Sequence, residues 1–267
     1  MGKVDLRKEA LLRELSKQTR LFMPDIQKRF QISESTARRL CVDLEKENKA
    51  VRILGGLQIA PSLLSEEAAE YSYEQRSTEN VEEKREIGAY AATLVQNRDI
   101  IYITGGTTVY AFVMVLRERI RSGELNHVVV MTNSLVNAEI LSGATRVLLT
   151  GGEFRPKRRD VAGYISEQNL MSTHFNKCFM GVDGIDLNDG IMALDMDTAN
   201  MDNIASQKSE HTYILADHHK FKKQSFVVFE RLDKKHTVIT DAGIEPELVR
   251  KAAEGGIDLF VAGEQSV

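Results

Sequence analysis

Two glycines followed by two threonines are the residues of this sequence best suited to holding an anion. Gly105, Gly106, Thr107 and Thr108 directly follow the apolar stretch 100–103 and open an amphipathic helical pattern. A strand, a glycine turn and a helix start together present free backbone N–H groups and the positive end of the helix dipole. Glycine turns also close many strand–helix junctions that bind nothing, so the surrounding elements decide what the motif means.

Seven apolar stretches predict strands, and helical patterns separate them. The predicted strands are 100–103, 128–132, 146–150, 177–182, 212–216, 237–240 and 257–261. The predicted helices between them include 107–121, 134–142, 196–208 and 245–254. This alternation predicts an open α/β sheet that is covered on both faces. Ligands of such sheets bind at the C-terminal ends of strands, where the strand order reverses.

Polar side chains follow further predicted strands. Asn133 and Ser134 follow the second strand, Asp183 and Asp186 the fourth, and Lys220 the fifth. Phosphate donors, carboxylates for hydroxyl groups and one lysine together suit a phosphorylated sugar or polyol. The alternative is that the aspartates cap turns and the lysine is solvated.

Other charged residues of this region indicate a binding site less clearly. His218 and His219 are adjacent, so in an extended segment they point in opposite directions, and we expect no metal site and no cofactor. The run 157–159 predicts an exposed loop, and Arg155 is a candidate phosphate contact.

The composition is that of a globular protein of one large or two smaller domains. The chain has 267 residues and two cysteines, Cys41 and Cys178, each inside an apolar pattern typical of a buried free thiol. No apolar stretch is long enough to cross a bilayer, and the polar start does not read as a signal peptide. We therefore expect a cytoplasmic protein.

Charge is distributed unevenly along the chain. Residues 1–60 carry 13 lysines and arginines against 8 acidic residues, whereas the remainder carries 22 against 31. A basic N-terminal part on an acidic body favours a polyanionic partner for the N-terminal part alone.

The N-terminal part has the pattern of a winged helix–turn–helix. Ser33 is a good N-cap for a helix whose apolar residues recur at helical spacing. Ser35, Thr36, Arg38 and Arg39 lie opposite or beside that apolar stripe, where they could reach phosphates and base edges in a major groove. The segment 50–59 alternates around two glycines and predicts a β-hairpin wing. Within it, Arg52 is a candidate phosphate contact. The alternative is a three-helix bundle with solvated arginines.

These observations divide the chain into three parts. We expect a DNA-binding domain at 1–59, a polar linker at 60–80 and an α/β ligand-binding domain at 81–267.

The motifs of both domains resemble the DeoR family of bacterial transcriptional regulators. In the N-terminal part the resemblance lies in the stretches 32–39, 43–45 and 52–56. One departure is Leu40-Cys41, where the family usually has Asp-Leu. The likeness continues to about Ile244 and implies a sensor domain similar to ribose-5-phosphate isomerase.

The resemblance also implies which residues contact the effector. The family's phosphate loop corresponds to Gly105, Gly106, Thr107 and Thr108, and its second ligand-facing turn corresponds to Asn133 and Ser134. Its acidic loop corresponds to Asp183 and Asp186, and the lysine of its Asp-x-x-Lys-Phe motif corresponds to Lys220. The sequence departs from the family at Thr104, where Asp is usual, and at Asp202-Asn203, where a basic pair is usual.

We therefore expect a transcriptional repressor whose operator affinity is controlled by a phosphorylated sugar. Paired recognition helices that read paired half-sites imply a homo-oligomer, a dimer or a tetramer. The isomerase's glycine-rich stretch is not recognisable at 187–195, so we expect no enzyme. The alternatives are a sugar-phosphate isomerase with an accessory DNA-binding domain, and an architectural DNA-binding protein.

Overall fold

The chain folds into two compact units, Met1–Glu70 and Tyr71–Val267. The computed structural model describes residues 3–18, 20–47, 49–53, 55–59, 72–221, 223 and 225–263. The expected linker at 60–80 lies outside the described residues as far as residue 71.

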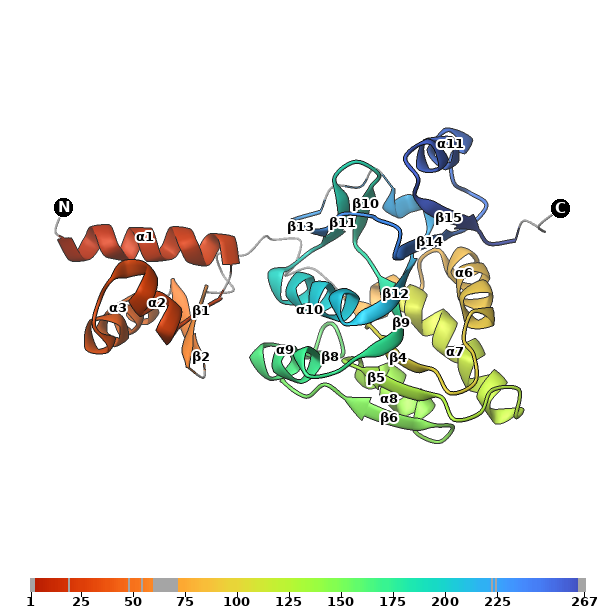
Figure 1. The fold of residues 1–267 in the computed structure, drawn as a ribbon, viewed down its shortest axis with the longest axis horizontal. Helices are drawn as coiled ribbons and strands as arrows, with labels where there is room; N and C mark the ends of the chain where they lie inside the picture. Colours follow the sequence, from red (N-terminus) through yellow and green to blue (C-terminus); the bar gives the residue numbers. More distant parts are fainter. Residues whose placement is uncertain are drawn as a thin grey trace. The chain divides into compact units, whose positions relative to one another are not determined.

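The described part of the first unit contains three helices and a small antiparallel sheet (Figure 1). Its elements are α1 (Lys3–Gln18), β1 (Arg20–Phe22), α2 (Met23–Phe30), α3 (Glu34–Lys46), β2 (Ala50–Ile53) and β3 (Gly56–Ile59). The predicted hairpin is β2 and β3, which pair antiparallel. The sequence did not predict β1, which pairs with β3 and completes a sheet in the order β1-β3-β2.

The predicted apolar stripe of α3 forms the centre of this unit. Ala37, Leu40, Cys41 and Leu44 are all buried and pack with apolar residues of α1, α2 and the sheet. Ser33 caps the helix, because its hydroxyl accepts a hydrogen bond from the Thr36 N–H. The stripe therefore turns the opposite, polar face of α3 to solvent.

The second unit is built on a seven-stranded parallel sheet. In spatial order its strands are β15 (Asp258–Val261), β14 (His236–Thr240), β12 (Ser209–Leu215), β9 (Phe175–Gly181), β4 (Ile100–Ile103), β5 (Val129–Thr132) and β6 (Arg146–Leu149). All seven strands were predicted. The edge strand β6 departs from the expectation of buried strands, because Leu148 and Leu149 are exposed.

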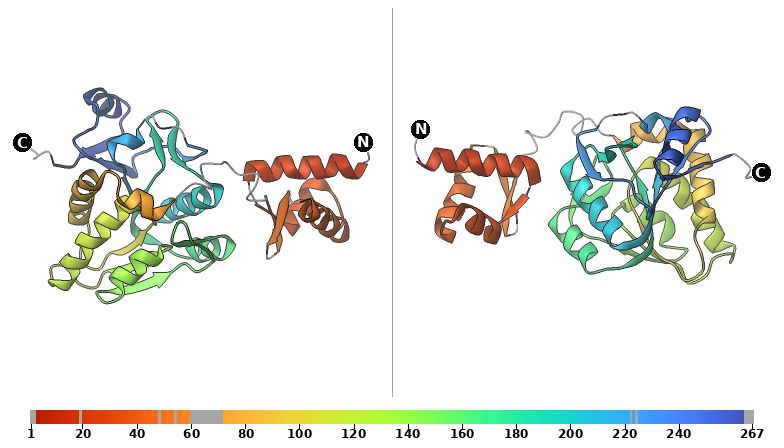
Figure 2. Two further views of the ribbon diagram at one scale, coloured as in Figure 1. Left: turned by 180° about the vertical axis from the view of Figure 1, so that it is seen from behind. Right: turned by 45° about the horizontal axis from the view of Figure 1, so that its top comes forward.

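Helices cover both faces of this sheet (Figure 2). One face carries α6 (Val81–Thr93), α7 (Thr107–Arg121) and α8 (Leu135–Leu141), and the other carries α9 (Tyr164–Met171), α10 (Met196–Gln207) and α11 (Pro246–Glu254). Each layer buries a separate apolar cluster, which is why the strands themselves read as continuous apolar runs.

Several short elements of this unit were not predicted. They are α5 (Tyr73–Ser77), the ribbon of β7 (Glu153–Arg155) and β8 (Asp160–Ala162), the 3-10 turn η2 (His218–Lys220), and the antiparallel sheet of β10 (Gly184–Asp186), β11 (Gly190–Ala193) and β13 (Val227–Glu230). The helix α5 corrects the linker expectation, because residues 72–80 belong to the second unit rather than to a connection.

Candidate functional site

A polar pocket lies where the order of the central strands reverses. From β4 the chain adds β5 and β6 on one side, and then β9, β12, β14 and β15 on the other. The pocket is at the C-terminal ends of β4 and β9 and encloses about 770 Å³, counted to its open mouth. This is the position at which open α/β sheets bind ligands.

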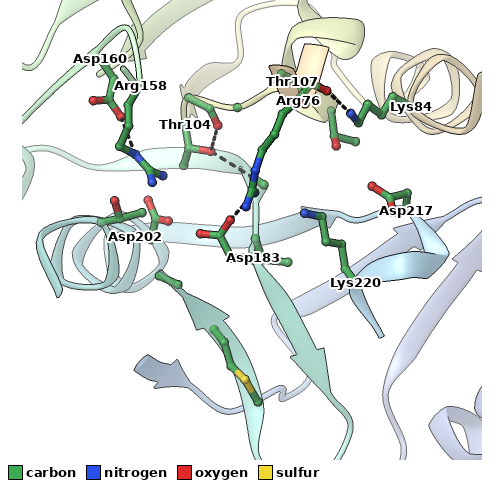
Figure 3. Close-up of a pocket in the computed structure, with 18 of the residues that line it drawn as sticks. Arg76, Lys84, Thr104, Thr107, Arg158, Asp160, Asp183, Asp202, Asp217 and Lys220 are labelled. Atoms are coloured by element: carbon green, nitrogen blue, oxygen red, sulfur yellow. Dashed lines mark hydrogen bonds and ion pairs between the residues drawn. The ribbon is translucent and has the colours of Figure 1, made fainter. Parts of the chain in front are cut away.

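Charged side chains of both signs line this pocket (Figure 3). The cations are Arg76, Lys84, Arg158 and Lys220, and the carboxylates are Glu79, Asp160, Asp183, Asp202 and Asp217. A pocket with this lining can bind a molecule that carries both an anionic group and hydroxyl groups.

The glycine turn after β4 forms one end of the pocket, as the sequence predicted. Gly105, Gly106, Thr107 and Thr108 all line it. Gly106 has a φ of 114° and a ψ of 158°, a conformation available essentially to glycine alone. The first helical hydrogen bond of α7 runs from the Tyr110 N–H to the Gly106 carbonyl, so the N–H groups of residues 107–109 precede it. Those groups and the helix dipole favour an anion at this end.

Two asparagines and a threonine hold the glycine turn in place. The Asn133 amide oxygen accepts a hydrogen bond from the Gly105 N–H at 3.0 Å, and the Asn137 amide donates to the Thr104 carbonyl at 2.9 Å. The Thr104 hydroxyl accepts from the Gly181 N–H at 3.1 Å, which joins the ends of β4 and β9. Asn133 also lines the pocket, so the turn and one pocket wall are fixed together.

Asp183 lies at the end of β9 and is already paired. One carboxylate oxygen accepts from the Leu194 N–H at 3.1 Å, and the other accepts from Arg76 at 2.7 Å. Lys84 donates to the backbone carbonyls of Arg76 and Glu79. The sequence singled out neither cation, because their partners lie far along the chain or in the backbone.

Lys220 and Asp217 come from the loop after β12, and both line the pocket. Burial lowers the pKa of Lys220, and the nearby Arg76 lowers it further, while Asp183 and Asp217 raise it in part. One carboxylate oxygen of Asp217 is buried and has no hydrogen-bond partner among the described residues. Such an oxygen is an acceptor for a hydroxyl group of a bound molecule.

Asp202 and Arg158 form the wall opposite Lys220 (Figure 3). Burial raises the pKa of Asp202 well above its ordinary value, with Arg158 offsetting part of the effect. Arg158 corrects the expectation of an exposed loop at 157–159, because it approaches Asp195 at 3.3 Å and lines the pocket. Arg155 instead forms a two-pronged pair with Asp160 and does not line it.

Two predicted contact residues, Ser134 and Asp186, are not among the residues that line this pocket. Ser134 is buried and caps α8 by accepting from the Asn137 N–H. Asp186 accepts from the N–H groups of Asn188 and Asp189 and so closes the turn between β10 and β11. Both fulfil the turn-capping alternative, which the same residue types serve equally well.

The polar face of α3 presents the predicted DNA-binding residues. The Ser35 and Thr36 hydroxyls lie at 3.0 and 2.9 Å from the Ser33 hydroxyl. Arg38 pairs with Glu34 along the helix at 2.7 Å. Arg39 is exposed and, within the part of the chain described, makes no hydrogen bond or ion pair.

The wing carries the remaining predicted contact. Arg52 on β2 is exposed and pairs with Glu45 of α3 at 2.7 Å. Arginines on the helix and on the wing thus belong to one unit, and their exposed guanidinium groups suit contacts to a DNA duplex.

Neither a metal-binding cluster nor a membrane-spanning helix is found in the described residues. Within those ranges, no group of three or more histidine, cysteine or acidic side chains is placed to hold a metal ion. No helix in the same ranges is long and apolar enough to cross a membrane.

Each of the two units matches a known family of protein domains. Residues 7–62 match the DeoR-like helix-turn-helix domain, and residues 79–242 match the DeoR C terminal sensor domain. The chain is 31% identical over 251 residues to a lactose phosphotransferase system repressor of Streptococcus mutans. This alignment covers 91% of this chain and 96% of that protein. It is 30% identical over 256 residues to the HTH-type transcriptional repressor GlcR of Bacillus subtilis, covering 94% of each.

Among solved structures, ribose 5-phosphate isomerase A of Methanocaldococcus jannaschii aligns with 54% of this chain and 56% of its own. The identity is 18% and the TM-score 0.42. The two domain matches and the full-length similarity to repressors establish that the chain belongs to the DeoR family of DNA-binding transcriptional regulators.

Proposed function

We propose that this chain represses genes of carbohydrate metabolism and that a phosphorylated sugar in the pocket of the second unit changes its affinity for operator DNA. The observation that carries the proposal is the pocket itself. A helix N-terminus with a glycine turn lines it, and carboxylates that can accept from hydroxyl groups line it as well. The mechanism needs no cofactor.

The phosphate is assigned to the end formed by Gly105, Gly106, Thr107 and Thr108. Backbone N–H groups and the α7 dipole stabilise negative charge there without requiring a basic side chain in the turn. The sugar hydroxyls are assigned to Asp183 and Asp217, because both carboxylates line the same pocket. Lys220 is assigned to an oxygen of the ligand.

Operator binding is assigned to the face of α3 and to the wing. Arg39 reaches the duplex directly, whereas Arg38 and Arg52 must first leave the carboxylates of Glu34 and Glu45. A homo-oligomer, a dimer or a tetramer, would place two such faces on paired half-sites. The effector controls this binding only if it prefers one state of the protein over the other.

Two measurements test the proposal. Thermal unfolding with glucose 6-phosphate, fructose 6-phosphate, ribose 5-phosphate, inorganic phosphate and nucleotides should show stabilisation by one sugar phosphate above that by phosphate alone. Fluorescence anisotropy with the DNA upstream of its own gene should then show a changed affinity when that compound is added. If no sugar phosphate stabilises the protein or shifts its DNA affinity, the proposal is wrong.

The raised pKa of Asp202 also supports a second candidate, a sugar-phosphate isomerase. A carboxyl with a raised pKa inside a sugar pocket is the kind of group that moves protons in an enediol reaction. Conversion of ribose 5-phosphate to its ketose, abolished in both Asp202→Asn and Asp183→Asn, would favour the enzyme. Absence of turnover with tight binding favours the sensor.

A further inference from the structure

The first elements of the second unit supply one wall of the pocket. Arg76, Glu79, Asn80 and Lys84 all line it, and they come from α5, the turn after it and the first turn of α6. None of them follows a strand of the sheet. In chain order these are the first elements that the structure describes in the second unit, so the pocket wall includes the part of this unit that is nearest in sequence to the DNA-binding unit.

Two cations hold α5 against the pocket. The Arg76 guanidinium contacts Asp183 at 2.7 Å, and both side chains are largely buried. Lys84 donates to the carbonyl of Arg76 at 2.6 Å and also to that of Glu79, beyond the end of the helix. Figure 3 shows Arg76 extending into the pocket toward Asp183, with Lys84 beside its backbone. The pair of Arg76 with Asp183 is therefore one of the contacts that hold α5, beside the Lys84 hydrogen bonds and the hydrogen bond from the Tyr73 N–H to the Lys157 carbonyl at 3.0 Å.

A phosphate competes with Asp183 for Arg76. The guanidinium matches phosphate oxygens in a two-pronged geometry and binds them at least as well as a single carboxylate oxygen. Removing Arg76 from a buried carboxylate is unfavourable unless other groups replace it. Lys220 lies close enough to interact with Asp183, and sugar hydroxyls can donate to the same carboxylate. A phosphorylated sugar thus satisfies both partners of the broken pair.

We propose that Arg76 is a phosphate-binding residue that exchanges Asp183 for the phosphate of the bound molecule, so that occupancy of the pocket repositions α5. The inference rests on the proposed function, because it assigns the route by which that site reaches the DNA-binding unit.

Ligand binding by variants tests the assignment of Arg76. Calorimetry with the sugar phosphates above should give an affinity about tenfold or more lower in Arg76→Gln than in the parent, as expected for a lost charge-assisted hydrogen bond. Arg76→Lys should retain part of the affinity. Arg85→Gln is the matched control, since Arg85 is exposed and, among the described residues, pairs with Glu82 three positions away. Equal affinities for the parent and Arg76→Gln would overturn the proposal.

Inorganic phosphate isolates the exchange of Arg76 between Asp183 and phosphate, because it carries no sugar hydroxyl groups that could bind Asp183. Asp183→Asn should bind phosphate more tightly than the parent, since Arg76 is then no longer held by a carboxylate. The gain should disappear in the double variant Arg76→Gln/Asp183→Asn, a coupling that a double-mutant cycle measures. A gain of the same size in the Arg76→Gln background would show that Asp183 acts on phosphate without Arg76.

Measurements of operator binding test whether α5 links ligand binding to the DNA-binding unit. At saturating sugar phosphate the parent should change its DNA affinity by about tenfold, within the usual range of such couplings, and Arg76→Gln by about twofold or less. A full response in saturated Arg76→Gln would overturn the role of α5 while leaving the proposed function intact. If the parent binds no sugar phosphate, the proposed function and this inference are both wrong.

Discussion

The side-chain amide oxygen of Asn133 accepts a hydrogen bond from the backbone N–H of Gly105 at 3.0 Å. The amide nitrogen of the same residue donates to the Val161 carbonyl, so a single buried side chain joins the turn after β4 to the ribbon strand β8. Asn133 therefore shapes the phosphate end of the pocket from behind, in addition to lining it.

Replacing Asn133 with alanine should weaken both folding and ligand binding. The Gly105 N–H would lose its acceptor in a largely buried position, which costs about 1–3 kcal/mol of the free energy of unfolding. Urea unfolding measures that loss, and calorimetry measures the accompanying loss of sugar-phosphate affinity. Asn126→Ala is the control, because Asn126 is exposed and its amide bonds only a nearby carbonyl. Equal unfolding midpoints for the two variants would contradict the role of Asn133.

Gly106→Ala should disrupt the anion end through the backbone alone. A Cβ at Gly106 would meet no atom within 4 Å, but the positive φ would be strained by about 1–3 kcal/mol. Gly143→Ala is the matched control, since Gly143 is exposed, its Cβ would also meet no atom within 4 Å and its φ is not positive. We expect sugar-phosphate binding to fall sharply in Gly106→Ala and to persist in Gly143→Ala. Equal binding by the two variants would show that the backbone conformation of Gly106 does not shape this turn.

Arg39→Ala should weaken operator binding more than any substitution on the outer face of α1. Arg39 projects from the outward face of α3 with no internal partner in the described residues, so its charge is available to DNA. Loss of one phosphate contact should also reduce the slope of log K against log salt concentration by about one unit. Anisotropy titrations at several salt concentrations measure both effects. Arg13→Ala is the control, because Arg13 is exposed on α1 near Glu9.

If Arg39→Ala retained the parent's affinity and salt slope, the recognition face would have to lie elsewhere on the first unit. A retained slope with reduced affinity would instead indicate that Arg39 contacts a base edge, since base contacts release few counterions.

The sequence was sufficient to predict the sheet and the glycine end of the pocket. Strands buried between two helix layers are apolar throughout, and glycine-threonine turns stand out between such strands, so local composition reveals both. Strand order is not a local property, yet the pocket depends on β4 and β9 being neighbours. The site was predictable only because strand ends in any parallel sheet share an edge.

Arg76 and Arg158 could not be identified from the sequence. Arg76 follows a polar stretch that reads as a linker, and its partner Asp183 lies 107 residues away. Arg158 sits in a basic run that reads as a solvated loop, until the β7–β8 ribbon turns it toward Asp160 and Asp195. Ser134 and Asp186 cap a helix and a turn and are not among the lining residues. The sequence does not separate capping from ligand contact, because both roles use the same residue types in the same places.

Asp202→Asn should stabilise the protein increasingly as the pH rises. Burial raises the pKa of the Asp202 carboxyl well above its ordinary 3.8, so the folded state keeps a proton that the unfolded state releases. The stability linked to that proton is fully present below about pH 4 and is lost as the pH rises through the folded pKa. The asparagine amide has the same shape but does not ionise, so its burial does not become less favourable as the pH rises. The difference in free energy of unfolding between Asp202→Asn and the parent, measured by urea unfolding from about pH 4 to about pH 7, should therefore grow in favour of the variant.

Other carboxyls titrate in both proteins and cancel in the difference. A difference that stays flat, or that grows in favour of the parent, would mean that Arg158 holds Asp202 ionised in the folded state.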